Sequence, residues 1–418
     1  ISVLTTEHTW LVEISQQIKN DFPDIPIIVG GVHAMLYPKA ILQIPCIDYV
    51  CTGEGELTLT NLCESIRKGR ADVRGIKGIG YRNGNDMIIN EGESLLDNIS
   101  NHFDDREIYY RQYPFFRDDE LKQFIASRGC PYKCSFCFNE QLRNAFKSKG
   151  KYVRMKDPEH FVKEIQLVKE SAVMKSIFFA DDLFTMDKSW LRRFLPLYKE
   201  KINIPYMCTT RANLMDEDIA RLLRDSGCHT VSFGIETGNE RIRKEILKKK
   251  ITNEEIINCG NILRKNGIRI QTSNMFCLPG ETIEDAFDTV RININIKADF
   301  TYSTLFMPFP DTNLAKYCIE NGYLKEGFSF KDLPKSFLTH SILRLQDRAK
   351  IENVQKVSYF LIKYPFILAP TEKLIRNFSF NRLYYALMFI GTFLRYKEER
   401  QISFFNTIQF LWRFRKSY

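Results

Sequence analysis

The chain has 418 residues, of which 44% are apolar and 27% charged, and its net charge is +9. This balance is ordinary for a folded globular protein and excludes a collagen-like, low-complexity or wholly disordered chain. An odd count of eleven scattered cysteines argues against a secreted disulfide framework and predicts reduced thiols in the cytoplasm. The chain begins at Ile1, without a methionine and inside a strand-like run, so we interpret it as lacking its natural beginning.

Residues 1–75 alternate short apolar runs with helical patterns. Strands are predicted at 1–4, 25–29 and 47–51, and helices at 10–18 and 57–66. This alternation is typical of βαβ units and predicts a parallel sheet, whose ligands bind beyond the carboxyl ends of the strands. The segments that follow these strands are Thr5-Thr6, Gly30-Gly31-Val32-His33 and Gly53-Glu54-Gly55-Glu56.

A hairpin is predicted over 79–89, with its turn at Asn83-Gly84, and the aperiodic residues 91–120 are interpreted as a linker. From residue 123 the alternation restarts, which predicts a closed or partly closed barrel with its chemistry at the C-terminal strand ends. The predicted strands are 123–126, 176–180, 205–209, 229–234, 271–276 and 301–306, and the helices between them are 158–169, 189–198, 217–223, 254–265 and 283–293.

The last part of the chain, 311–418, is helical in pattern, with breaks expected near Pro365 and Pro370. Residues 351–418 hold eleven Lys or Arg against four Asp or Glu and so carry +7 of the net charge. Because the rest of the chain is close to neutral, we predict no nucleic-acid partner. The basic, aromatic tail is interpreted as a helical cap on the barrel, with peripheral membrane contact or a protein interface as the alternatives.

The strongest chemical pattern is Cys130-Pro-Tyr-Lys-Cys134-Ser-Phe-Cys137. Three thiols at this spacing can bind three corners of one metal cluster, whereas an ordinary iron–sulfur cluster takes four cysteines. The next Cys or His residues along the chain are His160 and Cys208. Three ligands leave one metal position open for chemistry. The alternatives are a structural zinc site with a distant fourth ligand and a chance clustering of thiols.

This spacing, with Phe136 before the last cysteine, resembles the signature of the radical SAM superfamily. The resemblance implies that Cys130, Cys134 and Cys137 hold a 4Fe–4S cluster and that S-adenosylmethionine chelates its open iron, with Phe136 beside it. One electron would then cleave the sulfonium to a 5′-deoxyadenosyl radical.

The resemblance also assigns contacts with S-adenosylmethionine to successive strand ends. Asp181-Asp182 would lie near the methionine moiety, and Arg211 would pair with its carboxylate. Glu236 would accept hydrogen bonds from the ribose hydroxyls, and Pro279-Gly280 would follow the adenosine closely. Each assignment has a structural alternative: a helix cap at Asp181-Asp182, an ion pair between Arg211 and Glu236, and an ordinary turn at Pro279-Gly280.

Residues 28–34, 48–56 and 76–82 resemble the second half of the cobalamin-binding domain that is often fused ahead of radical SAM domains. The first two βα units are absent, as is the DxHxxG segment that supplies a cobalt-ligating His in some relatives, so His8 and His33 are not assigned as ligands. The alternative is a degenerate flavodoxin-like domain that only docks on the barrel. The cobalamin contacts implied are Thr5, Thr6, Gly30, Gly31, Gly53 and Glu54.

Together these patterns predict an α/β protein: a partial flavodoxin-like (Rossmann-type) cobalamin-binding domain (1–90), a linker (91–120), a radical SAM partial (β/α)6 TIM-like barrel (121–310) and a helical C-terminal extension (311–418). The eight cysteines outside the motif are expected to be small buried hydrophobic residues.

The predicted function is an anaerobic radical SAM enzyme that uses cobalamin to methylate, rearrange or cyclise an organic substrate. The wider family includes methyltransferases and the anaerobic Mg-protoporphyrin monomethyl ester cyclase type. The expected partners are a small-molecule or lipid-like substrate and an electron donor, namely a reductase, a flavodoxin or a ferredoxin. The alternatives are a radical SAM enzyme that never binds cobalamin and a non-catalytic iron–sulfur electron-transfer or scaffold protein. No catalytic residue is assigned.

Overall fold

The computed structural model describes residues 1–69, 72–101, 103–334, 336–378 and 381–400. The chain divides into two compact units. The first contains Ile1–Ile99 and Gly129–Arg154, and the second contains Ser100–Arg128 and the described residues from Met155 onward. The segment with the cysteine motif therefore belongs to the first unit. In the sequence, the residues before and after this segment belong to the second unit.

The first unit is built on a sheet of order β1-β2-β3-β4. Strands β1 and β2 are parallel, whereas β3 is antiparallel to both β2 and β4, so the predicted hairpin is confirmed. Its two-residue loop is Gly84-Asn85, because Asn83 pairs with Asp86, and Gly84 has φ 62°. The expected strand 1–4 is reduced to a single bridge between Ser2 and Gly30. The strands are β1 (Ile28–Val29), β2 (Tyr49–Cys51), β3 (Ile79–Asn83) and β4 (Asp86–Ile89).

Helices cover this sheet, and a later helix, α7, joins them. Leu142 and Phe146 at the end of α7 are buried with Leu95, against side chains of α2. The helical elements of this unit are η1 (Thr5–Glu7), α1 (His8–Asp21), α2 (Val32–Leu36), α3 (Pro38–Leu42), α4 (Gly55–Arg67) and α7 (Phe138–Ala145).

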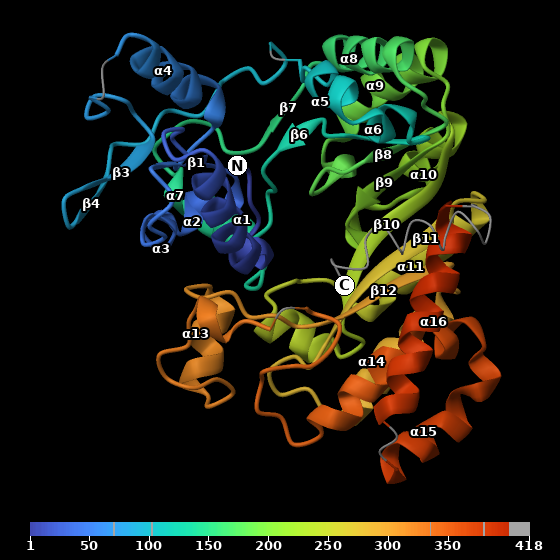
Figure 1. Cartoon of the computed structure of the whole chain (residues 1–418). Helices are drawn as coiled ribbons and strands as arrows, with labels where there is room; N and C mark the ends of the chain where they lie inside the picture. The colour runs from blue at the N-terminus through green and yellow to red at the C-terminus, as the bar shows by residue number, and fades with distance from the viewer. Residues whose placement is uncertain (70–71, 102, 335, 379–380, 401–418) are drawn as a thin grey trace. The chain divides into compact units, whose positions relative to one another are not determined.

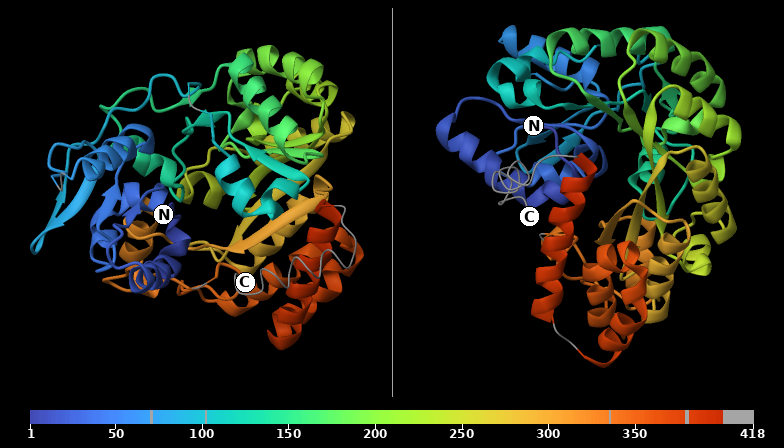
Figure 2. Two further views of the ribbon diagram at one scale, coloured as in Figure 1. Left: turned by 45° about the horizontal axis from the view of Figure 1, so that its top comes forward. Right: turned by 90° about the vertical axis from the view of Figure 1, so that its right-hand side faces the viewer.

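The second unit contains a six-stranded sheet of order β12-β11-β10-β9-β8-β5, and every neighbouring pair is parallel. The strands curve as part of a barrel wall, with α8, α9 and α10 along one face (Figure 1, Figure 2). This is the predicted partial (β/α)6 barrel. The strands are β5 (Leu121–Phe124), β8 (Ser176–Phe179), β9 (Tyr206–Thr210), β10 (Cys228–Glu236), β11 (Arg269–Phe276) and β12 (Phe300–Leu305). A separate pair consists of β6 (Ser127–Arg128) and β7 (Arg154–Met155).

Aromatic side chains fill the space between the strands and the covering helices. Phe179 of β8 stacks on Phe184 with ring centroids 4.6 Å apart, and Trp190 stacks on Phe194 at the same distance. These rings belong to one buried cluster that fixes the helices to the sheet. The helical elements are α8 (Pro158–Ser171), η2 (Phe184–Met186), α9 (Lys188–Lys201), η3 (Ala212–Leu214), α10 (Glu217–Asp225), η4 (Ile242–Ile246), α11 (Asn253–Lys265) and α12 (Ile283–Asn295).

Helices α14–α16 cap the end of this sheet. Ile351, Val354 and Leu361 of α14 are buried in one cluster with Phe276 and Leu305 of β11 and β12. The helix breaks at Pro365 as expected, but Pro370 lies in the first turn of α15, where proline costs no hydrogen bond. Among the described residues no helix is long and apolar enough to span a membrane. The elements are α13 (Asn313–Glu320), η5 (Phe330–Asp332), α14 (Arg348–Lys363), η6 (Pro365–Ile367), α15 (Leu368–Asn377) and α16 (Asn381–Arg400).

The segment 91–120, expected as a linker, contains two short helices, α5 (Glu107–Gln112) and α6 (Pro114–Asp118). Ile108, Tyr109 and Phe116 are about half exposed, at 59%, 61% and 49%. The apolar side chains of these helices are not gathered on one buried face, which is why no helical period is visible in the sequence.

Candidate active site

The cysteine loop is built by tight local geometry. Gly129, just before it, has φ 81°, and a Cβ there would lie 2.6 Å from the carbonyl oxygen of Tyr152, so only glycine is tolerated. The Cys137 amide donates to the Cys134 carbonyl at 3.1 Å, and α7 begins directly after Cys137. The side chains of Cys130, Cys134 and Cys137 are all half-buried.

Side chains from α7 and the following loop hold this turn in place. The Arg143 guanidinium donates to the carbonyls of Cys130 and Tyr132, the latter at 3.2 Å, and lies over the Tyr152 ring. The Tyr152 hydroxyl donates to Asn139 Oδ1 at 2.7 Å, and Asn139 Nδ2 is 3.6 Å from Cys137 Sγ. Arg143 and the N-terminus of α7 bring positive charge to the loop, which suits thiolates.

The donor set fits an iron–sulfur cluster. Within the described ranges no group of three His, Cys, Asp or Glu side chains is gathered closely enough to hold a single metal ion. A 4Fe–4S cluster binds its thiolates at separate iron corners, so its cysteines stand further apart than the ligands of one ion. Cys130, Cys134 and Cys137 are the residues that would hold it.

At the end of β8, the Asp181 carboxylate accepts hydrogen bonds from residues of the second unit, to which it belongs itself. Its Oδ2 accepts the Ala126 amide at 3.1 Å and its Oδ1 accepts the Ser127 hydroxyl. Burial raises the pKa of Asp181 to about 6, although these hydrogen bonds favour the charged form. Asp182 is exposed. The helix-cap alternative is wrong for both, because Asp187 accepts the first amides of α9.

The end of β9 is tied to the end of β8. The Thr209 hydroxyl donates to the Asp181 carbonyl at 2.7 Å and accepts the Phe184 amide at 3.1 Å. The Arg211 side chain follows directly, buried, with its Nε donating to Asn213 Oδ1 at 3.1 Å. An ion pair of Arg211 with Glu236 is not what the structure forms, because Glu236 pairs with a lysine.

Glu236, at the end of β10, instead pairs with Lys249, which donates to its Oε1 at 2.6 Å. Glu236 has φ 68°, a left-handed conformation that a non-glycine residue keeps only where its surroundings enforce it. Lys249 lies in no motif, so no pattern in the sequence indicates this role. Gly238, two residues on, packs so closely that a Cβ would lie 2.3 Å from the backbone of α12.

Pro279-Gly280, after β11, forms a turn. The Glu281 amide donates to the Leu278 carbonyl at 3.0 Å, and Gly280 has φ 74°, an arrangement typical of a type II turn. Glu281 forms a second hydrogen bond across the turn, in which its Oε2 accepts the Leu278 amide at 3.0 Å. Burial raises the pKa of Glu281 to about 8, so this carboxyl is mostly neutral at pH 7.

The residues expected to contact cobalamin divide into two groups. Gly31 approaches its own chain, since a Cβ there would lie 2.8 Å from the Val3 carbonyl, and Glu54 forms a buried bidentate ion pair with Arg154 at 2.7 and 2.9 Å. By contrast, a Cβ on Gly53 would meet nothing within 4 Å, although this glycine is buried, so there is space beside this part of the loop. Thr5 is buried and Thr6 exposed in η1, and Gly30 packs beside Cys51.

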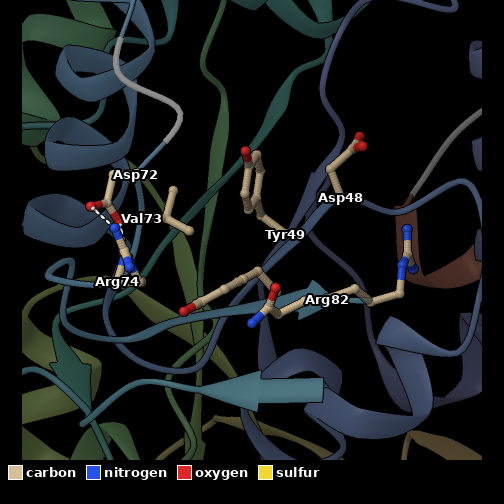
Figure 3. Close-up of a pocket in the computed structure, with 8 residues that line it drawn as sticks. Asp48, Tyr49, Asp72, Val73, Arg74 and Arg82 are labelled. Carbon is tan, nitrogen blue, oxygen red and sulfur yellow. Dashed lines mark hydrogen bonds and ion pairs between the residues drawn. The ribbon is translucent and has the colours of Figure 1, made fainter. Parts of the chain in front are cut away.

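A cleft of about 580 Å³ in the first unit contains none of the residues predicted for a site. Asp72 and Arg74 pair along one side (Figure 3), and the Arg82 guanidinium donates to the carbonyls of Leu42 and Ile44 at 2.7 and 3.1 Å. These charged groups bind their own chain, so we assign the cleft no role.

Of the eight other cysteines, seven are buried as expected. Cys63, on α4, is exposed, so the expectation is wrong for this residue.

Models of two known protein families match the two parts of this chain. A model of the radical SAM superfamily matches residues 124–292, and a model of the B12 binding domain matches residues 1–63. An uncharacterized methyltransferase of Pyrococcus horikoshii is 30% identical over 320 residues, which are 74% of this chain and 67% of that protein. The chain belongs to the radical SAM superfamily.

Two further relatives of this radical SAM protein are informative. The anaerobic magnesium-protoporphyrin IX monomethyl ester cyclase of Rubrivivax gelatinosus is 27% identical, with 74% of this chain and 55% of that protein covered. The structure of the cobalamin-dependent radical enzyme OxsB, with aqua-cobalamin and S-adenosylmethionine bound, has a TM-score of 0.63 at 14% identity and covers 94% of this chain and 63% of its own, which shows the shared fold. This chain thus spans between 55% and 67% of the length of these relatives.

The predicted family and fold class are therefore confirmed. Membership in the superfamily implies a 4Fe–4S cluster and S-adenosylmethionine, and the B12-binding match implies cobalamin.

Proposed function

We propose that this protein is a cobalamin-dependent radical SAM methyltransferase that acts on an unactivated position of a small organic or lipid-like substrate. The observation that carries the proposal is the loop from Cys130 to Cys137, whose three half-buried thiols are fixed by Arg143 and Tyr152. The similarity to a methyltransferase favours methylation over cyclisation.

Within this proposal the cysteine loop and the strand ends bind different parts of the cofactors. Cys130, Cys134 and Cys137 hold the cluster, which when bound supplies the electron that breaks a carbon–sulfur bond of S-adenosylmethionine. Arg211 binds the methionine carboxylate through charge-assisted hydrogen bonds. Glu236 accepts hydrogen bonds from the ribose.

The remaining strand ends position the cofactors. Pro279-Gly280 presents its backbone to the adenosine, and Phe136 and Asp182 line the methionine end. Asp181 acts indirectly, because its carboxylate holds Ala126 and Ser127, just before the cysteine loop in sequence. In the first unit, the space beside Gly53, where a Cβ would meet nothing within 4 Å, favours a contact with cobalamin, whereas Glu54 supports that loop through Arg154.

The test is product analysis on anaerobically reconstituted protein supplied with cobalamin, S-adenosylmethionine and a reductant. We expect 5′-deoxyadenosine from radical formation and S-adenosylhomocysteine from methyl transfer. Cys134→Ala should abolish both products, whereas Cys63→Ala, which removes an exposed thiol of the same unit, should leave both. Formation of 5′-deoxyadenosine alone would favour a cobalamin-independent enzyme. Neither product from a loaded cluster would favour an electron-transfer or scaffold protein.

We also propose that a reductase, flavodoxin or ferredoxin of an anaerobic cytoplasm supplies the electron. The odd number of eleven cysteines, scattered along the chain, supports a reducing compartment.

A second partner is proposed for the outer face of α16, namely an anionic membrane surface. Leu383, Phe389 and Ile390 on this face are 51%, 61% and 50% exposed. Arg382 and Lys397 are exposed near its two ends. An apolar helix face with basic residues beside it is typical of peripheral membrane contact. The aromatic residues predicted to contribute at 404–414 lie outside the described residues.

Sedimentation with phosphatidylserine vesicles at low and high salt tests this contact. Removal of the tail after Lys350 would destroy the core contacts of α14, so point variants are needed. Phe389→Asp should abolish salt-sensitive binding, whereas Phe116→Asp, on another exposed aromatic residue, in α6, should not. Equal binding by both variants would remove the proposal.

A further inference from the structure

A buried ion pair lies at the carboxyl end of β10. The side chains of Glu236 and Lys249 are 10% and 9% exposed, and the two charged groups are 2.6 Å apart. The Lys249 ammonium also donates to the Gly234 carbonyl at 2.7 Å. An ammonium group removed from water needs such partners, so Lys249 is fixed as firmly as the carboxylate it holds.

The backbone beneath this pair is fixed by a different residue. Arg243 is fully buried, and its Nε donates to the carbonyls of Ile235 and Thr237, both at 3.1 Å, on either side of Glu236. The Lys249 amide in turn donates to the Arg243 carbonyl at 2.9 Å. Arg243 therefore enforces the left-handed backbone of Glu236, while Lys249 sets the direction of its side chain.

Gly234 completes the arrangement. A Cβ at this position would lie 1.9 Å from Glu236 Oε1 and 2.7 Å from Lys249 Nζ. The carboxylate can fold back toward Lys249 only because this side chain is missing. The orientation of Glu236 thus depends on residues 234 and 249 as much as on Glu236 itself.

We infer that Lys249 is a positioning residue for S-adenosylmethionine, which holds the Glu236 carboxylate in the orientation that receives the ribose hydroxyls. This inference rests on the proposed ribose-binding role of Glu236. With Oε1 bound by Lys249, the plane of the carboxylate is fixed before the ligand arrives. An acceptor fixed in advance binds a vicinal diol more tightly than one that must be ordered on binding.

The test compares two ligands on one preparation of anaerobically reconstituted protein: S-adenosylmethionine and its 2′,3′-dideoxyribose analogue. The wild type should prefer S-adenosylmethionine about ten-fold or more, the value of a charge-assisted hydrogen bond. Lys249→Met and Glu236→Gln should each abolish this preference. Lys250→Met, which removes an exposed neighbouring lysine, should retain it.

The ratio of the two affinities does not depend on the fraction of protein that is folded, so a partly unstable variant still gives an answer. Lys249→Gln, which keeps a donor without the charge, should show an intermediate preference. If Glu236→Gln loses the preference and both Lys249 variants keep it, the inference is overturned while the ribose role stands. If Glu236→Gln keeps it, the ribose role itself is wrong and the inference falls with it.

Discussion

Glu281 should make the barrel unit less stable as pH rises, and Glu281→Gln should remove that dependence. The carboxyl is 4% exposed, and its burial raises the pKa from the ordinary 4.5 to about 8. A raised pKa means that the folded chain holds the proton more tightly than the unfolded chain. The stability that the neutral carboxyl provides is therefore complete below pH 4.5 and is lost as pH rises through 8.

The size of the effect follows from the two pKa values. A shift from 4.5 to about 8 at 1.36 kcal/mol per unit gives about 5 kcal/mol over the whole range. The loss is below about 1 kcal/mol at pH 5 and reaches about 4 kcal/mol at pH 8. Glutamine has the shape of the protonated acid and is neutral at every pH, and its amide oxygen can still accept the Leu278 amide.

Urea denaturation at pH 5, 6.5 and 8 measures this difference. Trp190, 4% exposed in the barrel core, reports unfolding of the second unit by fluorescence if Trp10 and Trp412 are replaced with phenylalanine. The variant should overtake the wild type in stability as pH rises, while Glu254→Gln, at an exposed glutamate of α11, should follow the wild type. Parallel loss of stability in wild type and Glu281→Gln would refute the reasoning.

Three further outcomes are expected. Arg154→Met should lower the free energy of unfolding by about 3–5 kcal/mol, because it leaves the Glu54 carboxylate buried without its ion-pair partner; an unchanged urea midpoint would contradict this. Asp181→Ala should reduce the iron bound per chain, since it releases the segment three residues before Cys130; full iron content would assign Asp181 another role. Gly238→Ala should cost about 1–3 kcal/mol or more in thermal unfolding, because the new Cβ meets the α12 backbone at 2.3 Å.

Most of the barrel could be predicted from the sequence, because a strand that will be buried can be recognised from a short run of its own residues. Strand β8, for example, is predicted at 176–180 and observed at Ser176–Phe179. The two helices in 91–120 could not be predicted, because side chains such as Phe116 are exposed and give no period. Pro370 shows a different limit, since proline breaks a helix interior but is accepted in the first turn.

The candidate site was only partly predictable for a different reason. Motifs locate residues at strand ends, but they do not show which other side chains will bind those residues. Glu54 looked like a ligand contact because of its glycine neighbours, yet it pairs with Arg154, one hundred residues away. Arg243, in the short helical element η4, and Lys249, just after it, hold Glu236, and neither belongs to a recognisable pattern. Which charged groups become buried together depends on the tertiary fold.

The packing of the cysteine segment has a consequence for how the protein can be divided. Leu142 and Phe146, which follow the cysteines, are buried against Leu95 and the side chains of α2, all within the first unit. A barrel expressed alone from residue 121 would leave this apolar face in water, and the turn that carries the thiols would lose the scaffold beneath it. The first unit therefore supports the segment on which the proposed radical chemistry depends. Any shortened form of the protein must keep it, or supply another surface for α7.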